Sequence, residues 1–271
     1  MAAIKNNGVS IYYEVHGTGK PLVLLRGLSG TVDGWEPYLE YFIDKYQLIL
    51  IENRGAGKSD KPDEPYTIEI FASDVKAVLD AEGIKKTALL GLSMGGFISQ
   101  AFYENYPDHV SALILGCTGT GFNDPNHVRF SLNVERILWA ERTPENRKEI
   151  HKEFFDHFFH KDFRKNNPKF MERMLEVSLV DPQPHYAYLR QLKACYFAGP
   201  LSENLNTVNV PTLIMHGIDD EITPVQNAYF LAENIPNADV NLHIFHHAGH
   251  MFFIEQKEKF IKILRTFLDD L

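Results

Sequence analysis

The chain has 271 residues, of which 44% are hydrophobic and 23% charged, so it is long enough to bury a sizeable core and is not a disordered protein. Its 27 basic and 36 acidic residues give a net charge of −9, and with no basic run the chain is a poor candidate for binding nucleic acid or an anionic membrane. Cys117 and Cys195 form no CxxC pair, and residues 1–17 lack the apolar run of a signal peptide, so we expect a cytoplasmic protein.

Short apolar runs in the first part of the chain predict strands, and residues with helical spacing separate them. Residues 11–15 alternate like a half-buried strand, whereas the later runs are continuously apolar, as expected for strands covered on both faces. These runs are 21–25, 47–51, 88–92 and 112–115, with helices predicted at 68–82 and 93–106. This alternation indicates a parallel sheet with helices on both faces.

The pattern changes after Cys117, because residues 118–206 contain no segment with the residue pattern of a strand. This stretch predicts four helices, at 127–140, 144–160, 169–179 and 185–196. Alternation then resumes with a strand at 212–216, a helix at 225–235, a strand at 240–245 and a helix at 255–268. We therefore expect core segments at 1–118 and 207–271, and a helical cap inserted at 119–206. The alternative is a separate bundle beside the sheet.

The motif with the clearest chemical meaning is Gly91-Leu92-Ser93-Met94-Gly95-Gly96, which joins a predicted strand to a predicted helix. A G-x-S-x-G sequence in this position is typical of a nucleophile elbow, in which a strained turn lifts the serine hydroxyl into a cleft. The glycines allow backbone and helix to pack closely around the turn. Ser93 is therefore a candidate nucleophile.

A serine nucleophile needs a base, and the base needs an acid that orients it. After the predicted strand at 212–216 come three consecutive acids, Asp219, Asp220 and Glu221, and His250 follows the strand at 240–245. Both segments should lie at the carboxyl edge of the sheet, beside the elbow. The residues alone leave the choice among the three acids open.

At this point the sequence resembles the α/β-hydrolase family over nearly its whole length, in its serine hydrolase branch of esterases and 3-oxoadipate enol-lactonases. The resemblance implies Ser93 as nucleophile, Asp220 as acid and His250 as base, with the backbone N–H groups of Leu28 and Met94 as the oxyanion hole. It also implies hydrolysis of a small ester or lactone without a metal or organic cofactor. The blocks that carry it are residues 26–30, 52–60, 91–96, 216–224 and 248–260.

Two further functions stay open: a carbon–carbon hydrolase of aromatic ring-cleavage products, and a ligand-binding receptor on a hydrolase scaffold. The carbon–carbon hydrolase function predicts a cationic residue facing Ser93.

The sequence departs from the family at Arg26, where histidine is usual. Arg26 is expected either to brace its loop by pairing with an acid or carbonyl, or to bind a substrate carboxylate. We interpret His243, His246 and His247 as solvated residues, since no cysteine or neighbouring aspartate completes a zinc site.

Overall fold

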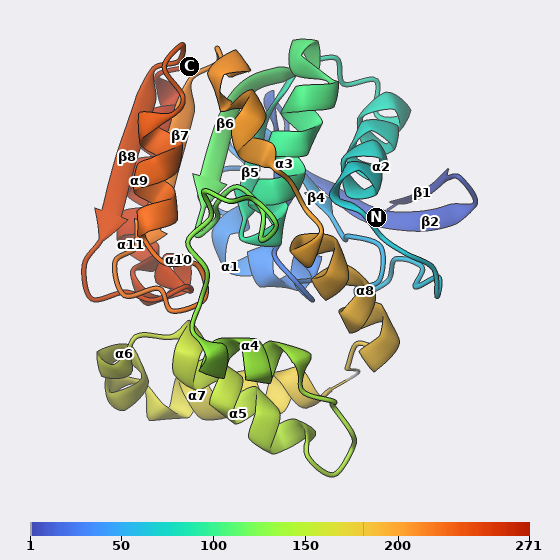
Figure 1. Cartoon of the computed structure of the whole chain (residues 1–271). Coiled ribbons are helices and arrows are strands. Elements are labelled where there is room, and N and C mark those ends of the chain that lie inside the picture. Colours follow the sequence, from blue (N-terminus) through green and yellow to red (C-terminus); the bar gives the residue numbers. More distant parts are fainter. Residues whose placement is uncertain (1, 181) are drawn as a thin grey trace.

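The computed structural model describes residues 2–180 and 182–271, and within them the strands form one eight-stranded sheet in the order β1-β2-β4-β3-β5-β6-β7-β8 (Figure 1). The contacts of β2 with β1 and β4 are antiparallel, and those from β4 through β8 are parallel. The expected fold class is therefore confirmed. The strands are β1 (Ala2–Asn6), β2 (Val9–His16), β3 (Lys20–Leu25), β4 (Tyr46–Ile51), β5 (Thr87–Leu92), β6 (Val110–Gly116), β7 (Thr212–Gly217) and β8 (Val240–Phe245).

Strand β1 was not among the expected elements, although the sequence contains a signal for it. Asn7 and Gly8 join β1 to β2 and both have positive φ, 49° and 86°. A two-residue hairpin of this kind favours Asn-Gly, because both central residues need positive φ. Most of β1 is exposed, so it lacks the apolar alternation by which the other strands were found.

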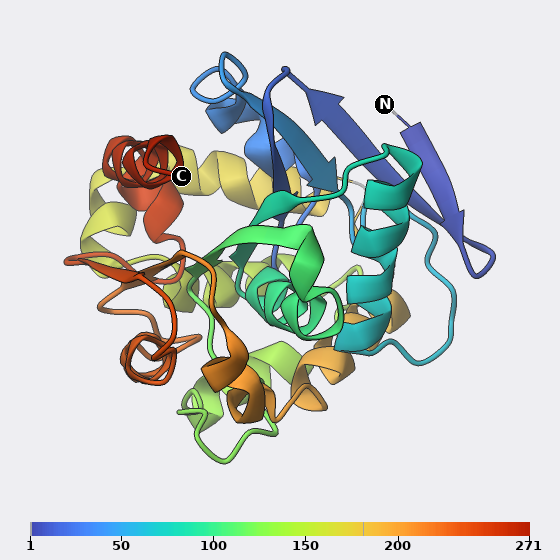
Figure 2. The ribbon, with the colours of Figure 1, turned by 90° about the horizontal axis from the view of Figure 1, so that it is seen from above.

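Helices cover both faces of the sheet because the apolar strands present side chains to each face. In β3, Val23 and Leu25 pack in one buried cluster with α2, α3 and α9, and Leu22 and Leu24 pack in a second cluster with α1, α10 and α11. Figure 2 shows the ribbons of α2, α3 and α9 on one side of the sheet and those of α1 and α11 on the other. These helices are α1 (Glu36–Leu39), α2 (Ile68–Ala81), α3 (Met94–Asn105), α9 (Gln226–Glu233), α10 (Phe252–Glu255) and α11 (Lys257–Asp269). None of the described helices is long and apolar enough to cross a membrane.

Between β6 and β7 the described chain contains helices joined by loops and no strand, and we call residues 119–206 the cap segment. In Figure 1, α4 to α7 lie together beyond one end of the sheet, and α8 lies between them and the core. The helices of the cap segment are α4 (Leu132–Trp139), α5 (Arg147–Phe158), α6 (Lys161–Asn166), α7 (Pro168–Leu179) and α8 (His185–Tyr196), followed by a 3-10 helix at Leu201–Thr207.

The helix expected at 144–160 is shorter in the structure, where α5 ends at Phe158 and a new helix follows. Phe159 is extended, and the His160 side chain caps α6 by accepting the N–H of Asp162 at 3.2 Å. The chain therefore turns at residues 158–160, which we call the α5–α6 corner. Apolar periodicity continues through this corner in the sequence, so a turn made by a capping side chain was not visible in the pattern.

Candidate active site

Ser93 occupies a strained turn between β5 and α3. Its φ is 56° and its ψ is −119°, a conformation that costs a residue other than glycine about 1–3 kcal/mol. Its N–H donates to the carbonyl of Gly116 at 2.9 Å, and its own carbonyl accepts the Thr118 hydroxyl at 2.9 Å. A Cβ atom at Gly91 would lie 2.2 Å from the carbonyl oxygen of Gly95, so close packing requires that glycine. The turn has the geometry of a nucleophile elbow and leaves Ser93 partly exposed.

Asp220 lies in the loop after β7 and is almost completely buried. Its Oδ1 atom accepts the N–H groups of Ile222 and Thr223, both at 2.8 Å, and its Oδ2 atom lies 2.8 Å from Nδ1 of His250 and 3.2 Å from Nε2 of His216. Burial by itself raises the pKa of this carboxyl. The electrostatic attraction of His250 and hydrogen bonds from His216 and His250 outweigh burial and hold the pKa well below its usual range. Asp220 is therefore an ionised, fully bonded carboxylate.

The two neighbouring acids point elsewhere. The Asp219 carboxylate is about half exposed and lies 3.6 Å from Nε2 of His160, and the exposed Glu221 carboxylate lies 2.5 Å from Nδ1 of His157. Both partners belong to the cap segment. The structure therefore brings only Asp220 of the three acids to His250, a choice that the residues alone left open.

His250 is buried, whereas His246 and His247 in the same loop are exposed. The Phe158 ring of the cap segment stands edge-on to the imidazole, with ring centroids 5.0 Å apart. Since Nδ1 faces the Asp220 carboxylate, it carries the proton, and Nε2 is left free to accept one. Phe158 belongs to an aromatic run of the sequence, but the sequence gives no signal for its contact with His250, because this contact joins two segments far apart in the chain.

Ser93 and Asp220 are both close to the buried thiol of Cys117, at the end of β6. Burial raises the pKa of this thiol well above its usual range, the Asp220 carboxylate raises it further, and the backbone N–H of Ser93 opposes the shift. A thiol that stays protonated is a poor nucleophile, so Cys117 acts as a small core residue. Its position places the elbow and the acid on either side of the carboxyl end of β6.

The backbone amides of Leu28 and Met94 donate no hydrogen bond to another group within residues 2–180 and 182–271. Met94 is the first residue of α3, where an N–H has no partner in the helix. Leu28 follows β3, and a Cβ atom on the adjacent Gly27 would lie 2.9 Å from Cβ of Ser93. Both unpaired donors thus belong to segments that adjoin Ser93.

Arg26 makes none of the polar pairings expected for a brace among the described residues. Its guanidinium lies over the rings of Trp35 and Phe253, 5.2 and 5.1 Å from their centroids, and its buried Nη1 atom has no hydrogen-bond partner in the described chain. Burial lowers the pKa of Arg26. The side chain therefore supports the loop after β3 by packing against two aromatic rings and not by an ion pair.

An apolar cluster joins the cap segment to the edge of the sheet near Ser93. Leu28 and Ile222 contribute to it from the core, one beside the elbow and one two residues after Asp220. The cluster also contains Phe130, Val134, Leu138, Tyr188 and Leu192, with Phe122, Phe154, Phe158, Leu189 and Tyr196 packed against it. The surroundings of the candidate site are therefore mainly aliphatic and aromatic.

The histidine cluster of the sequence is dispersed, and His247 instead meets two residues of the cap segment. Ligand atoms of His160, Asp162 and His247 lie within 4.8 Å of one another, but Asp162 and His247 are exposed. Nδ1 of His160 already accepts the N–H of Asp162 at the start of α6. We therefore assign this group to capping α6 and connecting the cap segment to the loop after β8.

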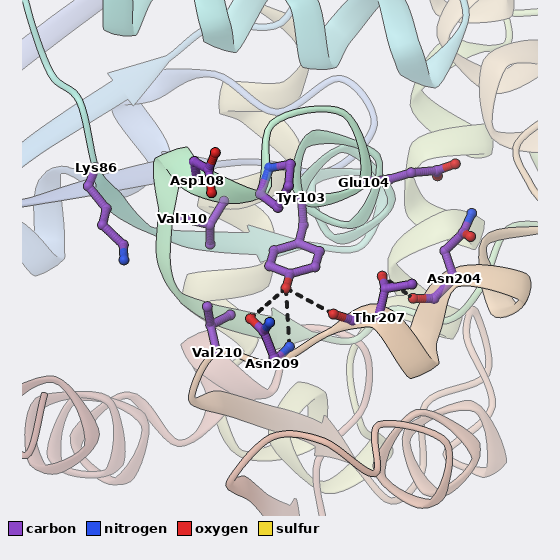
Figure 3. Close-up of a pocket in the computed structure, with 10 residues that line it drawn as sticks. Lys86, Tyr103, Glu104, Asp108, Val110, Asn204, Thr207, Asn209 and Val210 are labelled. Atoms are coloured by element: carbon purple, nitrogen blue, oxygen red, sulfur yellow. Dashed lines mark hydrogen bonds between the residues drawn. The ribbon is translucent and has the colours of Figure 1, made fainter.

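The structure also has a surface groove of about 510 Å³, at the opposite edge of the sheet (Figure 3). Lys86, Val110 and Val210 on its walls lie at the starts of β5, β6 and β7, and the Tyr103 hydroxyl at its centre bonds Asn209 and the carbonyl of Thr207. Ligands of parallel sheets bind at the carboxyl ends of the strands. This groove is therefore separate from the candidate active site.

The comparisons with known proteins agree with the observed fold. Residues 20–257 match the model of the alpha/beta hydrolase fold family, and the chain belongs to this family. A relative from Burkholderia vietnamiensis (strain G4 / LMG 22486), a 2-hydroxy-6-oxononadienedioate/2-hydroxy-6-oxononatrienedioate hydrolase, is 30% identical over 269 residues, which cover 95% of this chain and 90% of the relative.

Two solved structures are also similar over almost the whole chain. Est816, an N-acyl homoserine lactone degrading enzyme, superposes with a TM-score of 0.85 at 27% identity, covering 98% of this chain and 100% of the other. An esterase from Exiguobacterium antarcticum superposes with a TM-score of 0.82 at 29% identity, covering 97% of each chain. These proteins share the fold and carry names that refer to different substrates, so the comparisons establish a hydrolase family and leave the substrate undecided.

Proposed function

We propose that the protein is a serine hydrolase that cleaves a small carboxylic ester or lactone through an acyl-enzyme intermediate. The observation that carries this proposal is the buried pair of His250 and Asp220, 2.8 Å apart, at the same sheet edge as the strained turn of Ser93. A buried carboxylate that fixes the tautomer of an imidazole is what a serine nucleophile requires of its base.

In the proposed reaction the Ser93 hydroxyl oxygen attacks the substrate carbonyl, and Nε2 of His250 accepts its proton. Asp220 stabilises the resulting imidazolium, and the N–H groups of Leu28 and Met94 bind the oxyanion. When the tetrahedral intermediate collapses, the carbon–oxygen bond of the ester breaks and the leaving alkoxide takes the proton from His250. Water then attacks the acyl-enzyme carbonyl while His250 accepts a proton from it. When this second tetrahedral intermediate collapses, the bond to Oγ of Ser93 breaks, His250 returns the proton to that oxygen, and the acid is released.

The composition of the apolar cluster favours substrates whose acyl group is apolar. Most of its side chains are aliphatic or phenyl groups, and the hydroxyls of Tyr188 and Tyr196 already donate to the Leu138 carbonyl and to Glu135. Burying a polar group there without a partner would cost free energy. We therefore expect neutral esters and lactones of short to medium acyl length to be the best substrates.

Fluorophosphonate labelling tests the nucleophile, and a panel of p-nitrophenyl esters and lactones of increasing acyl length tests the substrate. The proposal expects wild type to label and turn over while Ser93→Ala does neither. A folded wild-type protein that neither labels nor hydrolyses any member of the panel would contradict it and favour the receptor function.

A carbon–carbon hydrolase is the second candidate, supported by the Burkholderia relative and by Arg142 of the cap segment. The Arg142 guanidinium lies 3.7 Å from the centroid of the ring of Tyr188, a member of the apolar cluster. Among the described residues Arg142 forms no ion pair. Such a cation could bind an anionic substrate. If carboxylated dienones are hydrolysed faster than esters, and Arg142→Met removes only that activity, this candidate replaces the first.

A further inference from the structure

Glu255 connects two segments that are far apart in the sequence. Its side chain lies at the end of α10, where Oε1 accepts the N–H of His160 at 2.7 Å and Oε2 accepts the N–H of Gly249 at 2.8 Å. Gly249 directly precedes His250, and His160 belongs to the α5–α6 corner. One carboxylate therefore bridges the cap segment and the loop that carries the proposed base.

Other contacts keep the corner and the loop close together. The N–H of Met251 donates to the carbonyl of Phe158 at 3.2 Å, so both neighbours of His250 are bonded at this junction. The absence of a side chain at Gly249 is required here, because a Cβ atom would lie 2.8 Å from that same carbonyl oxygen. The Phe158 ring in turn packs on the His250 imidazole. Movement of the corner would therefore displace the imidazole.

We propose that Glu255 is a positioning residue: its ionised carboxylate holds the His250 loop against the α5–α6 corner and thereby keeps the imidazole in its working orientation. This inference rests on the proposed role of His250. A carboxylate has acceptor oxygens for both amides, whereas a protonated carboxyl uses one oxygen to carry its proton. Protonation would thus release one of the two amides and loosen the junction.

The surroundings make the carboxylate easy to protonate. Burial raises the pKa of Glu255 to about 7, the two backbone N–H groups oppose this shift, and the carboxylates of Asp220 and Asp219 add to it. Other charged or titratable side chains on the elements around it include His160, Asp162 and Arg164 of the cap segment, His247 and His250 of the loop after β8, and Lys257 and Glu258 at the start of α11. Above pH 7 the carboxylate is charged, and keeping a charged carboxylate in this buried position lowers the stability of the fold. Such a costly arrangement is typical of a functional role.

Glu255→Gln tests the proposal, because glutamine keeps the shape and one acceptor but presents an NH₂ group to the second amide. We expect kcat/KM to fall about tenfold at pH 8.5, mainly in kcat, which corresponds to one lost charged hydrogen bond. At pH 5.5 Glu255 of the wild type is itself protonated, so the ratio of kcat/KM between wild type and variant should approach one.

Glu258→Gln is the matched control. Glu258 lies three positions later on the exposed side of α11, so its replacement removes the same charge and should leave the kcat/KM ratio near one at both pH values. A ratio for Glu255→Gln that is the same at both pH values would overturn the proposal.

Hydrogen exchange supplies a test that needs no turnover. At pH 8.5 the amides of Gly249 and His160 should exchange faster in Glu255→Gln than in wild type. In wild type alone, their protection, corrected for the intrinsic rate, should fall between pH 8.5 and 5.5; unchanged protection would refute the bridging role. If the wild type neither labels nor hydrolyses, the proposed function fails, and the exchange result still decides whether Glu255 holds the two segments together.

Discussion

The Nδ1 atom of His250 lies 2.8 Å from the Oδ2 atom of Asp220, and both side chains are almost fully buried. The second carboxylate oxygen of Asp220 is held by two backbone N–H groups, so the carboxylate cannot rotate away without breaking both. This relationship fixes the tautomer of the imidazole and points its Nε2 atom away from the acid. The predictions below test whether that arrangement works together with Ser93.

Replacing Ser93 by alanine should reduce turnover by roughly 10⁴-fold or more, because the covalent pathway is lost. The stability of the fold should hardly change, since alanine experiences the same backbone strain. Ser93→Gly should be equally inactive and more stable, because glycine tolerates a φ of 56° without strain. Urea unfolding and ester turnover of both variants provide the measurements. Retained turnover in Ser93→Ala would remove Ser93 as the nucleophile.

The acid can be identified by comparing three substitutions. Asp220→Asn should reduce kcat by about 10³–10⁴-fold, because an amide favours the wrong imidazole tautomer and cannot stabilise an imidazolium. Asp219→Asn and Glu221→Gln should stay within about threefold of wild type, since those carboxylates face His160 and His157. If Asp219→Asn is the inactive variant instead, the acid lies one residue earlier.

The base can be identified in the same way. His250→Ala should behave like Ser93→Ala, whereas His246→Ala and His247→Ala should be mild, because those two side chains are exposed and only His250 of this loop pairs with Asp220. Steady-state kinetics on one ester is sufficient. A chelator should leave wild-type activity unchanged; activity that is lost with the chelator and restored by zinc would indicate a metal enzyme.

Arg26→His restores the residue usual in the family. Since the guanidinium packs on Trp35 and Phe253 under the loop of Leu28, we expect neutral and carboxylated esters to lose activity in parallel. kcat/KM is measured for a matched pair of esters that differ only in a terminal carboxylate. A rise in KM of roughly tenfold or more for the charged ester alone would contradict this expectation and assign Arg26 to substrate binding.

Glu255 makes stability depend on pH in a direction opposite to that of most acids. Its pKa is raised to about 7 from the ordinary 4.5, so between these values the folded protein binds more protons than the unfolded chain. The free energy of unfolding should therefore fall as pH rises through this range, by at most about 2 kcal/mol after solvent screening. As pH rises from 5 to 8, the free energy of unfolding measured in urea should therefore fall less for Glu255→Gln than for wild type. Equal losses would contradict the prediction.

The sequence by itself determined the fold class and the positions of the candidate residues along the chain. Continuous apolar runs predicted β3 to β6 because both faces of such strands are buried, and these strands lie within a residue or two of the predictions. The strands expected at 212–216 and 240–245 are also present, as β7 and β8. The G-x-S-x-G turn predicted an elbow at Ser93 because its strain and close packing require those glycines. These features depend on neighbours in the chain, and a local pattern can record them.

Only the tertiary structure decided which acid meets His250, how Arg26 is held and what surrounds the base. Asp219, Asp220 and Glu221 are chemically alike and adjacent, and they differ only in where the loop after β7 directs each side chain. Phe158 and Glu255 bring the cap segment to His250 through contacts between segments about a hundred residues apart. Such contacts depend on the packing of two separate surfaces, and no periodicity within either segment encodes them.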